Sequence, residues 1–178
     1  MSIPAGLTAG TWNIDPSHSE VSFTVRHLMV SKVRGSFSGV AGSIVVADDI
    51  KVNATVDAAT LNTRDENRDA HVKSADFFDV ENHPTWTFVS TAVTGSGSDL
   101  KLTGDLTLRG VTKSVTFAVD FVGVNTDPWG NTKAGFEAKA EINRKDFGME
   151  WNAALETGGV LVGEQVHIEL GIQAAPQA

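Results

Sequence analysis

The chain contains no cysteine and no tyrosine, and only 5 of its 178 residues are proline. The absence of cysteine excludes disulfides, thiolate metal sites and cysteine nucleophiles. No segment approaches the ~20 apolar residues of a membrane-spanning helix. The opening "MSIPAGLTAGTWNID" lacks the positive start and the apolar run of a secretory signal. We therefore expect a cytoplasmic protein without stable membrane insertion.

Positive charge is also scarce in this chain. The 14 Lys and Arg residues stand against 22 Asp and Glu residues, which gives a net charge of −8. This charge repels nucleic-acid phosphates and no basic cluster offsets it, so nucleic acid is not an expected partner. The 5 histidines lack the spacing of a compact metal site. We expect no metal and no cofactor.

What the chain does have is a repeated alternation of apolar and polar residues. In the stretch 19–27, Val21, Phe23 and Val25 alternate with polar neighbours, which is the pattern of a half-buried strand. The same alternation recurs over residues 85–93, 100–108, 111–124, 136–144 and 166–172, and residues 33–47 and 50–59 also read as β-structure. The inward parity shifts between Phe37 and Ile44, which predicts a bulge near Gly39 or Gly42.

These strands predict one all-β domain over residues 1–178, with residues 1–9 loosely ordered. Antiparallel strands joined by short turns leave a sandwich or a closed barrel, and strands of ten or more residues favour the barrel. The inner faces combine large aromatic residues with glycine and alanine. That composition suggests a lumen with room for a guest molecule.

One charged segment interrupts the strands. Thr63 and Glu66 have the spacing of a capping box, which predicts a helix from about Arg64 to Lys73. This helix has too few apolar residues for a core-facing stripe and should lie mostly in solvent. The two phenylalanines at 77 and 78 should anchor it, so that a short surface helix segment, about 64–79, lies beside one end of the barrel.

One face of this helix carries polar groups at i, i+3, i+4 and i+7, namely Arg64, Asn67, Arg68 and His71. Such a stripe suits a phosphate or another anionic head group. The alternative is that both arginines pair with local carboxylates such as Asp65, Asp69 and Asp76.

Four stretches, in this order along residues 11–152, resemble the YceI-like family of polyisoprenoid-binding, lipocalin-like proteins. They are "WNIDPSHSEVSFTVRHLMVSKVRGSFSG", "TRDENRDAHVKSADFFDVENHPTWTF", "LTGDLTLRGVTKSVTF" and "INRKDFGMEWN". The resemblance implies an extended eight-stranded antiparallel lipocalin-like β-barrel whose long hydrophobic pore holds an isoprenoid chain. It implies carriage, storage or sequestration rather than catalysis. Many relatives carry signal peptides, and this chain departs from them at its N-terminus.

We expect an apolar tunnel that accepts a prenyl-type chain, with polar residues at one end for the head group. The predicted tunnel lining is Phe23, Val25, Phe37, Trp86, Phe88, Phe117, Val119 and Phe121, and the predicted polar contacts are His27, Arg64, Arg68 and His71. His27 is included because it continues the inward parity of its strand. The alternative for His27 is a strand-end histidine bonded to the backbone.

No nucleophile elbow, P-loop or dinucleotide-binding fingerprint occurs, so we expect no enzyme and no catalytic residues. Two other readings stay open. One is an enzyme that acts on a bound isoprenoid or quinone, for which His27 is the best-placed acid or base. The other is an interaction module whose barrel is filled by its own side chains. A homodimer is compatible with either reading.

Overall fold

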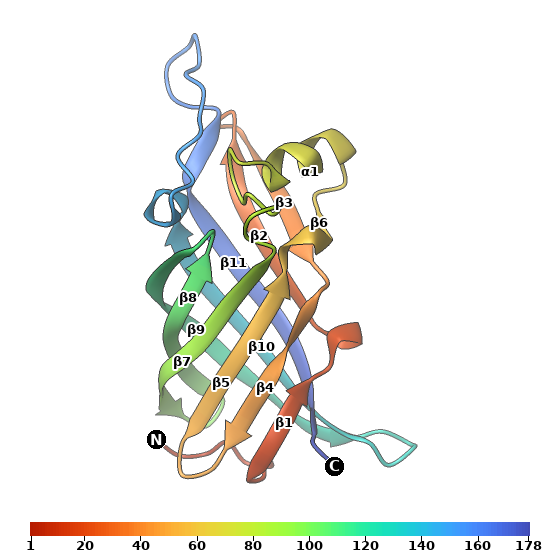
Figure 1. Ribbon diagram of the computed structural model, residues 1–178. Helices are drawn as coiled ribbons and strands as arrows, with labels where there is room; N and C mark the ends of the chain where they lie inside the picture. Colours follow the sequence, from red (N-terminus) through yellow and green to blue (C-terminus); the bar gives the residue numbers. More distant parts are fainter.

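The computed structural model describes residues 1–178, which form one sheet closed into a barrel (Figure 1). The strands are β1 (Gly10–Ile14), β2 (Glu20–His27), β3 (Ser31–Phe37), β4 (Val40–Val46), β5 (Ile50–Asp57), β6 (Leu61–Asn62), β7 (Thr85–Ser96), β8 (Asp99–Leu108), β9 (Val111–Thr126), β10 (Thr132–Asn143) and β11 (Val162–Pro176). One α-helix, α1 (Glu66–Lys73), and three short 3₁₀ helices, η1 (Pro16–His18), η2 (Ala58–Thr60) and η3 (Arg144–Phe147), complete the chain. None of the helices has the length and apolar character needed to cross a membrane.

The barrel has eight strand positions, all antiparallel to their neighbours. β11 pairs with β10 on one side, and on the other side with β1 and β2 in turn. β1 and β2 therefore act as one strand interrupted by η1. In the same way β3 pairs with β2 and β4 pairs with β1, so β3 and β4 form a second interrupted strand. Together with β5, β7, β8, β9, β10 and β11 these confirm the predicted eight-stranded antiparallel lipocalin-like barrel.

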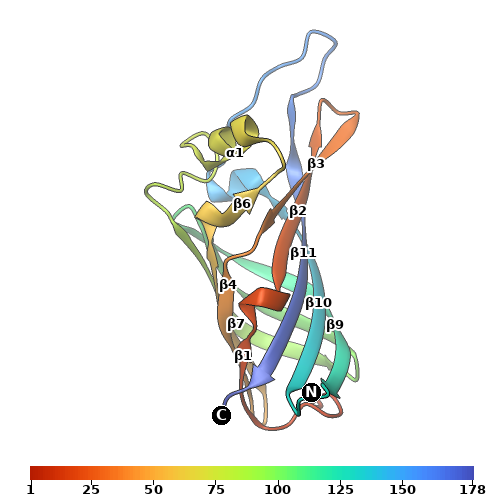
Figure 2. The ribbon, with the colours of Figure 1, turned by 90° about the vertical axis from the view of Figure 1, so that its right-hand side faces the viewer.

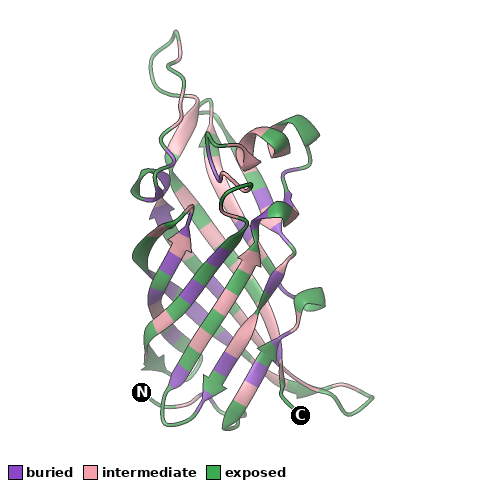
Figure 3. Cartoon of the chain, viewed as in Figure 1, coloured by how far each residue is buried: buried purple, intermediate pink, exposed green.

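The alternation of apolar and polar residues gives each strand of the wall one buried face and one exposed face. Buried and exposed residues alternate along the strands in Figure 3, as in β9, where Val115, Phe117, Val119 and Phe121 are buried. The predicted shift of parity is confirmed at Gly39, between β3 and β4. Phe37 and Val40 are both buried although their numbers differ in parity. A Cβ at Gly39 would lie 2.8 Å from Cβ of Asp57, so this close approach requires glycine.

The helix begins later than predicted, and the predicted capping box is wrong. Asp65 is the N-cap, because its carboxylate accepts a hydrogen bond from the backbone N–H of Arg68 at 2.9 Å. Arg64 has a φ of 66°, which prevents it from joining the helix. The Thr63 hydroxyl donates to the carboxylate of Asp69 instead of capping the helix. No residue of α1 is buried, as the scarcity of apolar residues predicted.

A packed cluster fills the end of the barrel opposite the helix. It consists of Leu7, Trp12, Ile44, Val46, Ile50, Phe121, Ala134 and Ala174, which we call the lower cluster. We expected residues 1–9 to be loosely ordered, yet Leu7 is only 4% exposed and Ile3 packs against this cluster. The indole N–H of Trp12 donates to the carbonyl of Thr8 at 3.0 Å. Figures 1 and 2 show the N-terminal segment at this end.

Candidate functional site

An elongated cavity of about 520 Å³ runs through the middle of the barrel. Of the 43 residues that line it, 35 are hydrophobic, so it suits an apolar guest. Val162 and Ile172 both line the cavity from β11, and the wall between them spans ~26 Å, because a bulge lets Val162–Val166 face only two steps of β2. With a strand tilt of about 40°, this corresponds to ~20 Å along the barrel axis. The cavity is therefore a tunnel rather than a compact pocket.

Glycines in the wall keep the lumen open where large aromatic residues face inward. Phe23 is paired across the sheet with Gly35, and a Cβ at Gly35 would lie 2.4 Å from Cζ of Phe23. A Cβ at Gly104 would likewise lie 2.4 Å from Cζ of Phe88. Both rings therefore lie against the backbone of a neighbouring strand instead of projecting across the lumen.

The tunnel opens at the end that carries α1, which we call the mouth. Its lining reaches Arg26, His27, His71, Trp151 and Leu161 there. The side chain of His71 is 41% exposed, so the lining is continuous with the surface. Figure 2 shows α1 on one side of this end and the β2–β3 hairpin on the other. The opposite end is filled by the lower cluster, which leaves the mouth as the route for a long chain.

An aromatic cluster below the mouth holds the segment that follows α1. The Phe78 ring lies 4.7 Å from Trp86, 5.9 Å from Phe37 and 6.0 Å from Phe23, measured between ring centroids. Phe77 and Phe78 are 8% and 9% exposed, as expected of anchors. They bury aromatic surface that α1 itself cannot supply, and they fix the helix beside the mouth.

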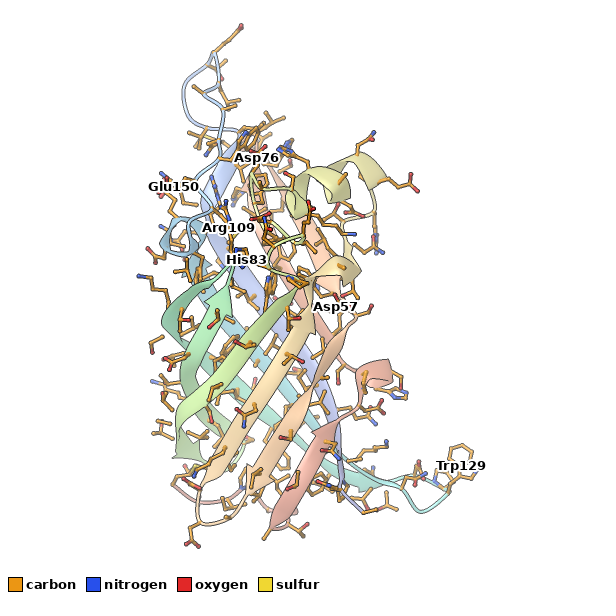
Figure 4. All side chains as sticks on the ribbon, in the orientation of Figure 1. Asp57, Asp76, His83, Arg109, Trp129 and Glu150 are labelled. Atoms are coloured by element: carbon orange, nitrogen blue, oxygen red, sulfur yellow. The ribbon has the colours of Figure 1, made fainter.

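A second contact ties the same segment to the wall from outside. The guanidinium of Arg109 donates to the carbonyls of Ala75 at 2.7 Å and Gly148 at 2.6 Å (Figure 4). Arg109 lies in the β8–β9 turn, so three segments far apart in sequence meet at this point. The rim of the mouth is therefore fixed by hydrogen bonds as well as by aromatic packing.

The polar stripe predicted on α1 is only partly at the tunnel. Asn67, Arg68 and His71 line it, whereas Arg64 is exposed and does not. Neither arginine forms an ion pair, so the predicted pairing of both with local carboxylates is wrong. Arg68 instead donates from Nε to the hydroxyl of Thr63 at 3.0 Å and from Nη2 to its carbonyl at 2.5 Å.

His71 is held by three neighbours at the rim. Its Nε2 lies 2.9 Å from a carboxylate oxygen of Asp76, and its ring packs edge-to-face on Phe77 and Trp151 at 5.2 Å and 4.7 Å. His27, on the other side of the mouth, makes no side-chain hydrogen bond. The alternative of a histidine ring bonded to the backbone is therefore not seen, and the ring is available to a guest.

Arg144 is a buried cation that forms part of the tunnel lining, and it is only 2% exposed. Its Nε donates to the carbonyl of Gly163 at 2.8 Å, and its Nη1 donates to those of Met149 and Trp151 at 2.6 Å and 2.9 Å. Burial lowers the pKa of Arg144 from its usual value, and the charge of Glu164 acts in the opposite direction. Because carbonyls take up its donors, Arg144 fixes the loop that leads into β11.

The structure brings most of the predicted site residues to one tunnel. Every predicted site residue lines the tunnel except Arg64 and Phe121. Phe121 faces inward but packs on Phe136 at 5.4 Å, within the lower cluster. Sequence reasoning missed Trp151 and Leu161, which line the mouth from a segment without strand alternation. Whether the lining residues bind a ligand stays a prediction.

Comparison with known proteins agrees with this architecture. The YceI-like domain pattern matches residues 12–174. The UPF0312 protein SAS2572 of Staphylococcus aureus (strain MSSA476) is 41% identical over 163 residues, covering 89% of this chain and 93% of the relative. The crystal structure of Burkholderia cenocepacia BcnA has a TM-score of 0.77 and 22% identity, covering 90% of this chain and 98% of BcnA. A polyisoprenoid binding domain from Saccharophagus degradans has a TM-score of 0.73 and 15% identity, covering 93% and 98%. The chain therefore belongs to the YceI-like family.

Proposed function

We propose that the barrel binds the chain of a long lipophilic isoprenoid along its tunnel and keeps the polar head at the mouth. Carriage, storage or sequestration of that molecule would follow from such binding. The observation that carries the proposal is the elongated, largely hydrophobic cavity in the middle of the barrel. The structural likeness to a polyisoprenoid binding domain adds support at the level of the fold.

The tail should dominate the binding free energy. A guest that buries ~400 Å² of apolar surface gains on the order of 10 kcal/mol before the costs of association. A charge-assisted hydrogen bond to the head adds only about 1.5–3 kcal/mol. Contacts at the mouth therefore select the orientation and the class of ligand more than they hold it.

The groups at the mouth differ in how free they are to meet a head group. His71 and Arg68 already bond to Asp76 and Thr63, whereas the His27 ring has no partner. His27 therefore gives up no internal hydrogen bond when it binds a guest. We assign it the first contact with the head group, and Arg68 and His71 supporting contacts.

The test compares a tunnel residue with a mouth residue, using geranylgeraniol as the isoprenoid probe. Phe117 lies 5.5 Å from Phe88 inside the tunnel. Phe117→Asp should abolish binding, because the tail would meet a buried carboxylate. Arg68→Ala should weaken binding by about 10- to 100-fold at most. Ala118→Asp, on the outer face of the same strand, is the matched control and should bind as the wild type does.

Equal losses in Phe117→Asp and Arg68→Ala would contradict a tail-dominated site. Native mass spectrometry of protein purified from its natural host gives a second readout. A retained isoprenoid supports carriage, whereas an empty chain supports an interaction module. A chemically altered product after incubation with the probe would instead support the enzyme reading.

A further inference from the structure

The β2–β3 hairpin ends in three consecutive large apolar residues that face solvent. Leu28, Met29 and Val30 are 43%, 58% and 81% exposed. Single exposed apolar side chains are ordinary on a protein surface, but a contiguous group is a mark of an interaction site. None of the three lines the tunnel, so the ligand site does not explain them.

The backbone conformation of this turn makes large apolar residues unusual at two of its positions. Leu28 and Met29 have φ values of 52° and 59°, and Val30 N–H donates to the carbonyl of His27 at 3.2 Å. This is the turn in which Asn-Gly is preferred, because a larger side chain in the left-handed region is strained. Here two large apolar residues accept the strain while remaining exposed, and the only packing of note is that of the Met29 sulfur on Gly159 of the neighbouring loop. A local rule broken with so little compensating burial points to function.

A second loop extends this surface. The backbone N–H of Leu28 donates to the carbonyl of Leu161 at 2.9 Å, which joins the hairpin to the loop before β11. Val160 in that loop is 38% exposed. We call Leu28, Met29, Val30 and Val160 the apolar tip. Figures 1 and 2 show both loops at the mouth end, where the loop before β11 projects farthest and the hairpin ends near the level of α1.

Two cations lie directly below the turn. Arg26 and Lys32 are cross-strand partners, both are exposed, and neither forms a salt bridge. Although Glu156 lies on the neighbouring loop and the chain as a whole has a net charge of −8, the part of the hairpin beyond Glu20, residues 21–34, carries only positive charge. An apolar end with cations at its base matches the acyl region and the phosphates of a phospholipid surface.

The position of the apolar tip connects it with the tunnel. Arg26 and His27 of the hairpin and Leu161 of the neighbouring loop line the mouth. A stable protein interface buries about 800 Å² per partner, which is more than a projecting tip of four side chains offers. A bilayer requires no matching shape, and it also contains lipophilic molecules of the kind that the tunnel suits.

We propose that the apolar tip enters the surface of a phospholipid bilayer and places the mouth against it. An isoprenoid chain then passes between bilayer and tunnel with little exposure to water. This inference rests on the proposed function, and it adds the place where the ligand is exchanged.

The test is flotation of the full chain with vesicles of phosphatidylcholine and phosphatidylglycerol. The double variant Leu28→Asn with Met29→Gly installs the residues that the turn prefers, so the hairpin should remain intact and Tm should not fall. We expect at least a tenfold loss of vesicle affinity. Val30→Ser, outside the strained positions, should cause a smaller loss of the same sign. Trp129→Ser is the control, because Trp129 is 83% exposed and lies near the opposite end (Figure 4).

Flotation of the double variant like the wild type, or an equal loss in Trp129→Ser, would overturn the proposal. Failure of the wild type to float would also overturn it and would favour a protein contact at the tip. Geranylgeraniol supplied from ethanol, without vesicles, separates this inference from the proposed function. The wild type and the double variant should bind it equally. If neither protein binds geranylgeraniol, the proposed function fails. If both proteins bind it equally and also take it up equally from vesicles, only the docking proposal is refuted.

Discussion

The open lumen depends on glycines that let aromatic rings lie against the wall, and Gly35→Val tests this directly. The added side chain would occupy the place of the Phe23 ring, whose Cζ lies 2.4 Å from a Cβ at that position. The ring must then turn into the tunnel. Gly35 has no left-handed φ, so valine fits the backbone and the effect comes from crowding. Overpacking of this kind costs about 1–3 kcal/mol of stability.

The effect on binding follows from where the ring would block the tunnel. Phe23 pairs with Ile168, and the wall from Ile168 to Ile172 spans ~13 Å of the ~26 Å between Val162 and Ile172. A guest entering from the mouth would lose about half of its apolar contacts, or ~5 kcal/mol of the ~10 kcal/mol estimated for the tail. This corresponds to an increase in Kd of roughly 5,000-fold.

The assay is titration with geranylgeraniol, with thermal unfolding measured in parallel. Gly171→Val is the matched control, because Gly171 lies on the outer face of β11 and a Cβ there meets no atom within 4 Å. Adding Phe23→Ala to Gly35→Val should reopen the tunnel and recover most of the affinity. Wild-type affinity in Gly35→Val, or no recovery of affinity in the double variant, would refute the idea that Gly35 lets the Phe23 ring lie against the wall.

Two further predictions concern stability. Arg144→Met leaves buried carbonyls without their donors and should lower the free energy of unfolding by about 3 kcal/mol in urea titrations. The control Lys145→Met should lower it by less than about 1 kcal/mol. Similar losses for both variants would contradict the role of Arg144. Hydrogen bonds from Ser17 and His18 hold the pKa of Asp15 well below its usual value, so its contribution to stability is present above about pH 4 and is lost as the pH falls further. Asp15→Ala should therefore cost about 1 kcal/mol at pH 7 and progressively less below pH ~4, and a cost independent of pH would count against this account.

Alternation along the chain predicted the strands and the direction of their side chains, and strand length then favoured a barrel over a sandwich. Period two fixes which face a residue occupies, and it placed Phe88, Phe117 and Val119 in the tunnel. Period two does not give depth along the barrel axis. Phe121 continues the same face as Val119, but it lies one step further, where the lower cluster fills the lumen. Depth depends on strand tilt and on what closes the end, and neither is encoded locally.

The errors around α1 have a different cause. Helical spacing placed Arg64 on the stripe with Arg68, but Arg64 lies outside the helix in a left-handed conformation. Thr63, expected to cap, bonds with Asp69 and Arg68 instead. Which hydrogen bonds form here depends on competition between nearby polar groups for the same donors, and a single sequence does not resolve that competition. Trp151 was missed because its place at the mouth depends on the carbonyl contact of its segment with Arg144.

The lower cluster fills the end of the barrel opposite the mouth, and this fixes an order of events for a linear guest that enters at the mouth. The end of the chain farthest from the head enters first and leaves last, so uptake and discharge are reversals of one another. Release then requires withdrawal of the whole hydrocarbon length, and each added methylene should slow it by a similar factor. Residence time would therefore report guest length, and longer guests would be retained in preference to shorter ones of equal head group.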